Sequence, residues 1–509
     1  MNRKFRKRGP SNRGKTFNVF AEEQRPQPTW RSLKLGRNPV TLLDLVLSVP
    51  LISEALARID SFGSKGRAYP LSVIVRWLWM MPLCQYRCLE HMADRLLTDE
   101  VVKWAILGDP DALREDRRSG VAPSRAYISG EISDHLDMLI AQLQHLYDSM
   151  IAALLRWDPR LKYALVYDRS MIPTWGNPER AEHAWNEETG RWEKTGHRLP
   201  ATDPDAASWV KGDDAGFGYG LSKLIFCRRP IPLGLSLKAP NGNDERLIAT
   251  RMLIEAHSKF GPLLAIEENE LAVFIADAGL PSKDFYATLR AAGYEPVTPY
   301  NWETKEEEVL RDVKLVTRKG DHDLELDVRR DGTPLCPRKD WDTEKFKDGR
   351  RPLRPLPSDI TAKAQRWRCP LNAVGECANP CPLQPYYKDE LNSNVLYPRV
   401  KKFVGNLDKE DGFRYVLFPR IGEEARQLIS YRSRVEHDFS YTKGRGCFGG
   451  DGEARLPIRE EKRLKLRLLC TLIPLVALAM LNLGIPMPAD LLDDWFSEIE
   501  GPPAGGEAA

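Results

Sequence analysis

The sequence predicts an α/β protein built on a mixed sheet with helices. Short apolar runs rich in β-branched and aromatic residues alternate with helical patterns between residues 159 and 300. Hairpins join the early strands of this region, whereas helices join the later ones. Hairpins connect antiparallel strands and longer crossovers connect parallel ones, so both kinds of pairing are expected in one sheet.

We predict the strands of this region at residues 162–168, 217–227, 231–237, 271–277 and 295–300. Hairpins join the first three strands, and Arg228, Arg229 and Pro230 form the second of these turns. Helices at 244–259 and 282–292 connect the remaining strands, with Ser282 as a suitable N-cap. An antiparallel half joined to a parallel half is the arrangement of a ribonuclease H-like core.

The segment before the sheet, residues 40–157, reads as helical. Apolar residues at alternating spacings of four and three mark one helix face, namely Ile132, Leu136, Leu139, Leu143, Leu146 and Met150. A dimer seam would share this pattern, but the run is short and lacks regular flanking charges, which favours a core-facing helix. Pro123 and Ser124 indicate a helix start, and a helix-turn-helix at this point stays open.

The distribution of charge is more informative than its sum, because the formal net charge of the 509 residues is only +3. The first twenty residues contain no acid and seven cations, Arg3, Lys4, Arg6, Lys7, Arg8, Arg13 and Lys15. The last twenty contain acids and no Lys or Arg. We interpret the first segment as an arm for phosphate and the last as a solvated tail, although a solubilising arm would look the same.

The apolar stretch at 468–481 is too short to span a bilayer and contains Pro474, so we predict a buried core helix. No apolar segment follows the basic start, so no secretory signal is expected. The chain has nine cysteines, an odd set that favours a reducing compartment over a disulfide framework. We therefore expect a cytoplasmic protein.

A cysteine cluster lies in the segment 301–427, which is rich in charge and proline and reads as an irregular insertion into the core. Cys369, Cys377 and Cys381 are close in sequence, and Cys336 could supply a fourth thiolate. Tetrahedral zinc would stabilise a segment without an obvious core. The spacing is not a standard zinc pattern, so zinc and plain reduced thiols both stay open.

Two acids follow apolar strands, and they are the first candidates for metal ligands. Asp168 and Asp277 each end a buried apolar run, where the chain leaves the sheet. Ligand sites form at the ends of adjacent strands, and Mg²⁺ prefers hard oxygen ligands. Each residue alone would also suit a strand-ending turn, so only the pair in this order of elements favours a site.

A third acid lies in the segment 429–443, which can form a helix. Arg432, Glu436 and Lys443 are spaced by four and seven residues and therefore share one face. That face has an acid suited to metal between two cations suited to phosphate. An exposed helix with an ion pair between Arg432 and Glu436 is the simpler alternative.

These motifs resemble bacterial insertion-sequence DDE transposases that have an insertion between the second Asp and the Glu. The family's Glu helix has the signature Tyr-x2-Arg-x3-Glu-x6-Lys, which Arg432, Glu436 and Lys443 match. Ile429 occupies the Tyr position, and Tyr431 is out of register. The acid boxes around Asp168 and Asp277 are also similar to the family's, as are Asp203-Pro-Asp-Ala and the following Gly-Tyr-Gly at 218–220.

The resemblance implies a ribonuclease H-like catalytic domain with two Mg²⁺ ions, for which Mn²⁺ could substitute, held by Asp168, Asp277 and Glu436. It implies cleavage at the ends of double-stranded transposon DNA, strand transfer into target DNA, and a homodimer or larger synaptic complex. Arg432 and Lys443 would hold DNA phosphates. Two alternatives are another ribonuclease H-like nuclease or resolvase, and a domesticated, non-catalytic DNA-binding protein.

The expected organisation follows from these assignments. It is a basic arm at 1–38, a helical DNA-binding domain at 39–158, the first part of the catalytic domain at 159–300, the insertion at 301–427, the Glu helix and C-terminal core helix at 428–485, and an acidic tail at 486–509.

Overall fold

The protein is described by a computed structural model. The described residues are 39–63, 69–85, 89, 100–107, 123–174, 180–187, 191–199, 203–211, 214–238, 245–267, 270–299, 309–319, 322–329, 335–336, 354–355, 367–368, 395–396, 403–404, 423–446 and 460–492. The predicted basic arm and the tail beyond residue 492 lie outside them.

The N-terminal part is helical, as the sequence predicts. Its described helices are α1 (Pro39–Leu47), α2 (Pro50–Ser61), α3 (Leu71–Cys84), α5 (Glu100–Leu107) and α6 (Arg125–Trp157). Ser124 caps α6, because its side chain accepts a hydrogen bond from the Tyr127 amide at 3.2 Å. This confirms the helix start predicted at Pro123 and Ser124.

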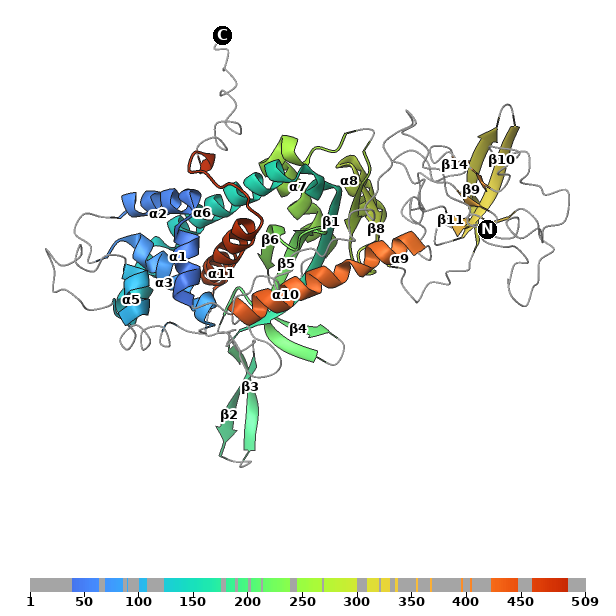
Figure 1. Cartoon of the computed structure of the whole chain (residues 1–509). Coiled ribbons are helices and arrows are strands. Elements are labelled where there is room, and N and C mark those ends of the chain that lie inside the picture. The colour runs from blue at the N-terminus through green and yellow to red at the C-terminus, as the bar shows by residue number, and fades with distance from the viewer. Residues whose placement is uncertain are drawn as a thin grey trace, which may run out of the picture. The chain divides into compact units, whose positions relative to one another are not determined.

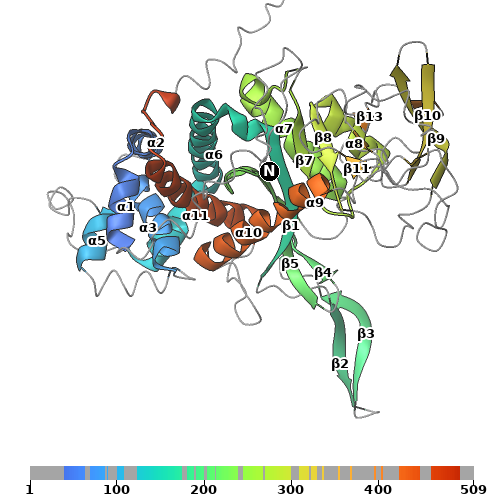
Figure 2. The same cartoon turned by 45° about the vertical axis from the view of Figure 1, so that its right-hand side comes forward.

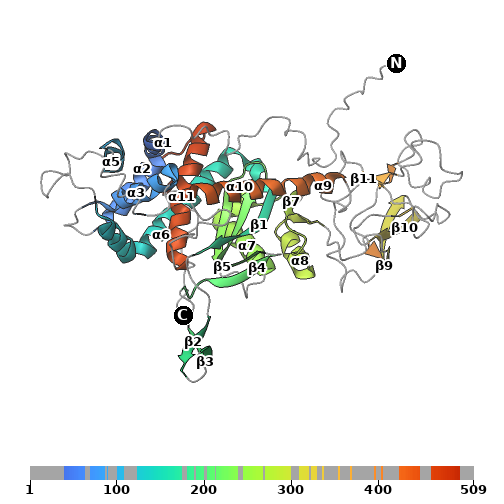
Figure 3. The ribbon, with the colours of Figure 1, turned by 90° about the horizontal axis from the view of Figure 1, so that it is seen from below.

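The apolar face of α6 is directed into the core. Leu139, Leu143 and Leu146 are fully buried, which confirms the core-facing interpretation. Leu136 is only half-buried, next to His135, where the helix has non-helical dihedral angles and bends. Helix α11 (Glu461–Asn482) lies beside α6 (Figures 1 and 3).

One six-stranded mixed sheet organises the middle of the chain (Figure 1). Its strands are β1 (Ala164–Pro173), β4 (Ala207–Lys211), β5 (Asp214–Phe226), β6 (Pro232–Lys238), β7 (Ala272–Ile275) and β8 (Tyr294–Val297). Their order is β4-β5-β1-β7-β8, with β6 also paired to β5. Strands β4, β5 and β6 pair antiparallel, whereas β1, β7 and β8 pair parallel, so the mixed sheet is confirmed.

Strand β1 is longer than expected, because Asp168 lies within it and the strand continues to Pro173. The second half of β1 lies beside β5, where the Thr174 amide donates to the Phe217 carbonyl at 3.1 Å. Gly218 permits this approach, since a Cβ there would lie 2.0 Å from the carbonyl oxygen of Ile172. The prediction that Asp168 ends its strand is therefore wrong.

The connection between β1 and β5 also differs from the expected simple hairpin. It contains a two-stranded ribbon, β2 (Arg180–Asn186) with β3 (Arg191–Leu199), and then the strand β4. The ribbon projects from the sheet beside β4 (Figure 2). Its charged sequence has little apolar alternation, so the sequence gives no strand signal there. The hairpin of β5 and β6 is confirmed.

Two predicted helices precede the parallel strands β7 and β8 in the chain. Helix α7 (Glu245–Leu264) leads to β7, and α8 (Lys283–Ala291) leads from β7 to β8. Ser282 caps α8 by accepting a hydrogen bond from the Phe285 amide at 3.2 Å, as predicted.

The insertion contains strands, although the sequence predicts an irregular segment. One three-stranded sheet has the order β10-β9-β14, formed by His322–Arg329, Val309–Lys319 and Phe403–Val404. A second has the order β11-β12-β13, formed by Arg354–Pro355, Trp367–Arg368 and Val395–Leu396. Charged residues within β9 and β10 weaken the apolar alternation on which strand prediction depends.

The C-terminal part has three described helices, α9 (Glu423–Ser430), α10 (Arg432–Gly446) and α11. The single helix predicted at 429–443 is interrupted at Tyr431, which is buried. Helix α11 is long and apolar enough to cross a membrane by composition, but 83% of its apolar window is buried inside the protein. The predicted core helix, including Pro474, is therefore confirmed.

The described residues form two compact units. One contains Lys162–Tyr167 and Ala265–Arg432. The other contains the residues up to Leu161, Asp168–Leu264 and the residues from Ser433 onward. The first therefore holds the parallel strands β7 and β8 with the insertion, and the second holds the N-terminal helices, β4 to β6 and α11.

Candidate active site

The two predicted aspartates have matching positions relative to a parallel strand pair. Val166 of β1 is paired with Ile275 of β7, and each acid follows its paired residue by two positions. Asp168 is 9% exposed, and its Oδ1 accepts a hydrogen bond from the Arg169 amide at 2.8 Å. Asp277 lies beyond the end of β7, and its side chain is 47% exposed.

The Arg432 side chain joins the start of α10 to Asp277. Its Nη1 donates to Oδ1 of Asp277 at 2.7 Å, across 155 residues of sequence. The same oxygen accepts a hydrogen bond from the Ala278 amide at 2.7 Å. The structure therefore brings together two of the five residues that the resemblance assigns to the catalytic site, through an ion pair that the sequence does not predict.

The other two residues of the signature lie on α10, as expected. Glu436 is exposed and Lys443 is half-buried. In the described part of the chain, no three His, Cys, Asp or Glu side chains are grouped closely enough to hold a metal ion. The assignment of Asp168, Asp277 and Glu436 as metal ligands therefore stays a prediction.

The opposite face of α10 is fixed by a buried charge pair. Lys223 of β5 donates from Nζ to Oδ2 of Asp438 at 2.5 Å and to Oγ1 of Thr442 at 2.7 Å. The side chains of Lys223 and Asp438 are both 0% exposed. Burial lowers the pKa of Lys223, while the nearby Asp438 carboxylate acts in the opposite direction.

Two further contacts hold this face of α10. Arg434 donates from Nη1 to the Cys227 carbonyl at 2.7 Å, just after the end of β5. The Lys223 ammonium also lies 4.9 Å from the centre of the Phe439 ring. Sequence reasoning missed this arrangement. A lysine inside the apolar run of β5 was the available signal, because a buried ammonium needs a partner.

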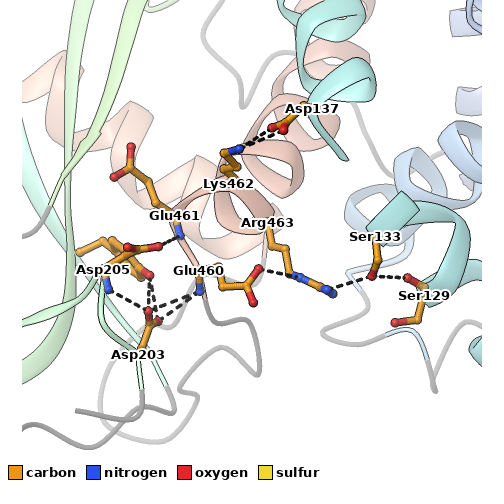
Figure 4. Close-up of polar contacts among 10 residues, drawn as sticks. Ser129, Ser133, Asp137, Asp203, Asp205, Glu460, Glu461, Lys462 and Arg463 are labelled. Atoms are coloured by element: carbon orange, nitrogen blue, oxygen red, sulfur yellow. Dashed lines mark hydrogen bonds and ion pairs between the residues drawn. The ribbon is translucent and has the colours of Figure 1, made fainter. Parts of the chain in front are cut away.

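The Asp203 motif noted in the sequence has a structural role. Asp203 is fully buried, and both of its carboxylate oxygens accept a hydrogen bond from the Tyr219 hydroxyl at 2.8 Å. They also face the Glu460 amide at 3.4 Å, and Asp205 accepts from the Glu461 amide at 3.1 Å. The two acids therefore cap the N-terminus of α11 from a distant loop (Figure 4).

The first turn of α11 is also tied to α6. Lys462 forms an ion pair with Asp137 at 2.7 Å, and Arg463 donates to the Ser133 hydroxyl at 2.9 Å (Figure 4). The pKa of Tyr219 is raised by burial and then by its hydrogen bond to Asp203, so the phenol stays protonated and donates. The acids at 203 and 205 thus position a core helix.

The predicted zinc site falls almost entirely outside the described residues. Cys336 is buried, whereas Cys369, Cys377 and Cys381 are not among the described residues. Zinc binding by this cluster stays a prediction.

Neither known protein-family models nor curated protein sequences match this chain. Among solved structures, the piggyBac transposase synaptic complex with hairpin DNA is 9% identical, with a TM-score of 0.33, and the alignment covers 93% of this chain and 82% of that one. The Mos1 mariner paired end complex with Mn is 11% identical, with a TM-score of 0.16, and the alignment covers 50% of this chain and 76% of that one. Scores this low support no conclusion about function.

Proposed function

We propose that this protein is a DDE transposase, which cleaves DNA at transposon ends and joins it to a target in a reaction that needs a divalent metal. Its catalytic domain would be a ribonuclease H-like core formed by the mixed sheet and α10. Asp168, Asp277 and Glu436 would be the metal ligands, and Arg432 and Lys443 would contact DNA phosphates.

The ion pair between Arg432 and Asp277 carries this proposal. These residues come from two motifs, 155 positions apart, that the resemblance assigns to one site, and their side chains meet at 2.7 Å. Glu436 lies one helical turn after Arg432 and therefore on the same face of α10. The matching positions of Asp168 and Asp277 after the Val166–Ile275 pair support the same arrangement.

The donor set fits a hard divalent cation, because all three predicted ligands are carboxylates. Among the described residues, the two hydrogen bonds to the Asp277 carboxylate fall on Oδ1, from Arg432 and from the Ala278 amide. Glu436 is exposed and therefore accessible to a ligand. Two Mg²⁺ ions, when bound, would activate the attacking oxygen and stabilise the leaving oxygen of a phosphodiester.

The chain's own cations have a separate task. Arg432 holds Asp277 in the absence of DNA, and a guanidinium also matches the geometry of a phosphate. Lys443, on the same face of α10, would supply a second phosphate contact. These cations would set affinity for DNA, and the carboxylates would set the rate of the chemical step.

The test is cleavage of duplex DNA carrying the ends of the element that encodes this chain, in Mg²⁺ or Mn²⁺. The wild type should cleave, and Asp168→Asn and Asp277→Asn should each lose cleavage by at least about a hundredfold while still binding DNA. Asn retains the shape of Asp, so these variants isolate the charge. Crosslinking on paired ends should also show a homodimer or larger complex.

Two results would contradict the proposal. Wild-type protein that binds these ends but does not cleave in either metal would indicate the non-catalytic, DNA-binding alternative. Cleavage of the ends without any joining to target DNA would indicate another ribonuclease H-like nuclease.

A further inference from the structure

Helix α7 has one face in the core and one face on the surface. It packs against β5, β6 and α6, which belong to the same compact unit, and its buried residues include Ala249, Met252, Leu253, Ala256 and Phe260. On the outer face, Leu247 is 63% exposed and Ile254 is 56% exposed. They are seven residues apart, about two helical turns, so they lie on the same side of α7. The outer face therefore presents two large aliphatic side chains to solvent.

Two opposite charges share this outer face. Arg251 and Glu255 are exposed, and they follow Leu247 by about one and two turns. Their spacing would allow an ion pair within the helix, but Arg before Glu is the less favourable order for such a pair. In the described part of the chain, neither side chain forms an ion pair or a hydrogen bond. We call Leu247, Arg251, Ile254 and Glu255 the α7 surface.

We propose that the α7 surface binds the α7 surface of a second copy of this chain, with the two helices antiparallel. A two-fold axis midway between Arg251 and Glu255 places each Arg251 level with the partner's Glu255, so symmetry forms the ion pair twice. Ile254 is then one residue from the axis, about 1.5 Å along the helix, and meets its own copy. Leu247 comes within one residue of the level of the partner's Ser258, which is also exposed.

Charge and size favour a second copy as the occupant. A face with one cation and one anion is complementary to itself, and the antiparallel arrangement pairs both charges without a third group. One helix face is smaller than the about 800 Å² per partner that stable interfaces bury, so the contact should be weak on its own. DNA that holds two chains close together would raise their effective concentration and strengthen it. The inference rests on the proposed function only for this last step, because the contact itself needs no DNA.

Charge reversal tests the ion pair, by sedimentation velocity of the full chain without DNA or metal. Arg251→Glu and Glu255→Arg should each weaken self-association by at least about tenfold, because two attractive pairs become repulsive. The double variant should return to within about threefold of the wild type, because the exchanged charges attract again. This recovery distinguishes a second copy from an unrelated protein. Both positions are exposed, so unfolding midpoints should stay near the wild-type value.

Disulfide formation detects even a weak contact. Ile254→Cys introduces a thiol close to the two-fold axis, where two copies can reach the roughly 6 Å between Cα atoms that a disulfide allows. Under oxidation it should form a covalent dimer that the wild type does not form, and paired DNA ends should increase the yield. Phe62→Cys is the matched control, because Phe62 is an apolar residue of similar exposure, 52%, at the end of α2. It should not crosslink.

Two results would overturn the proposal. One is an Ile254→Cys chain that forms no covalent dimer with or without DNA; if the introduced thiol also resists alkylation, another part of the same chain covers the α7 surface. The other is self-association that both charge reversals leave unchanged. Cleavage is assayed separately, so the two hypotheses fail in different ways. A wild type that never cleaves, with recovery in the double variant, would contradict the proposed function and support this contact.

Discussion

The two faces of α10 differ in what satisfies their polar groups. On the inner face, Asp438 and Thr442 are bonded to Lys223, and none of these side chains is more than 1% exposed. On the outer face, Glu436 is exposed. Both faces carry an acid, but only the inner one has its counter-ion inside the fold. The acid on the outer face is the one left accessible to a ligand.

This difference teaches that charge on a helix has to be interpreted together with burial. A buried ion pair adds little net stability, because removing both charges from water offsets most of their attraction. It does, however, exclude arrangements in which either partner is buried alone. The inner pair therefore fixes how α10 lies on β5, and this in turn fixes the direction of the outer face.

The largest expected effect is on the inner face. Asp438→Ala should lower the free energy of unfolding by about 3–5 kcal/mol, because Lys223 is left buried without its counter-ion. Urea unfolding followed by circular dichroism measures this loss. The double variant Lys223→Met with Asp438→Leu should recover most of it, since no charge is then buried. If the free energy of unfolding of Asp438→Ala were within about 1 kcal/mol of the wild-type value, the two faces of α10 would not differ in this way.

A substitution on the outer face should affect cleavage rather than stability. Glu436→Gln should change the free energy of unfolding by less than about 0.5 kcal/mol, as is usual for an exposed position. Its metal-dependent cleavage should fall by at least about a hundredfold. Ser440→Ala, at another exposed position one turn later, serves as the control for both measurements. A stable Glu436→Gln variant that cleaves normally would exclude Glu436 as a ligand.

A smaller effect is expected at Lys443. Lys443→Ala should reduce the salt slope of DNA binding by about 1, because one phosphate contact is lost among several. At saturating DNA its cleavage rate should stay near that of the wild type. Anisotropy titrations at several salt concentrations, with single-turnover cleavage, separate these two quantities. A large loss of rate at saturation would instead place Lys443 at the reacting phosphate.

The smallest effect is expected at Glu270, whose partners all belong to the same compact unit as Glu270 itself. Burial alone would raise the pKa of Glu270. The pKa is nevertheless lowered, because the carboxylate accepts hydrogen bonds from the Tyr163 hydroxyl and the Glu267 amide and lies near the Lys162 ammonium. A lowered pKa stabilises the fold above the unfolded-state value of about 4.3, and this contribution is lost as pH falls through the folded-state pKa. Tyr163→Phe should therefore cost about 1 kcal/mol at neutral pH and less in acid. Urea unfolding of both proteins across this pH range measures the cost. A difference in free energy of unfolding between Tyr163→Phe and the wild type that stayed constant with pH would contradict the role given to Glu270.

The sequence predicts those parts of the fold whose signals are local. Ser124 and Ser282 cap the helices expected of them, because an N-cap needs only residues within one turn. The strands around Val166 and Ile275 are recognised from apolar runs, and their acids follow at equal distances. The length of β1 is not predicted, because it depends on the contact of Ile172 with Gly218.

The candidate site is predictable from sequence only in part. Spacing identifies Arg432, Glu436 and Lys443 as one face, but it cannot reveal that Arg432 contacts Asp277. Asp438 lies between Glu436 and Lys443 of the signature, and the sequence gives no sign of its burial. Its partner is in a strand 215 residues earlier, and no local pattern connects two such positions.

The separation of Lys223 and Asp438 also bears on the order in which the chain folds. With synthesis at roughly 5–20 residues per second, Asp438 is made roughly 10–40 s after Lys223. During that interval β5 carries an ammonium group whose counter-ion does not yet exist. The strand therefore cannot reach its final packing until α10 has emerged from the ribosome. Nascent chains that end before α10 should consequently remain clients of chaperones, however complete the rest of their sheet is.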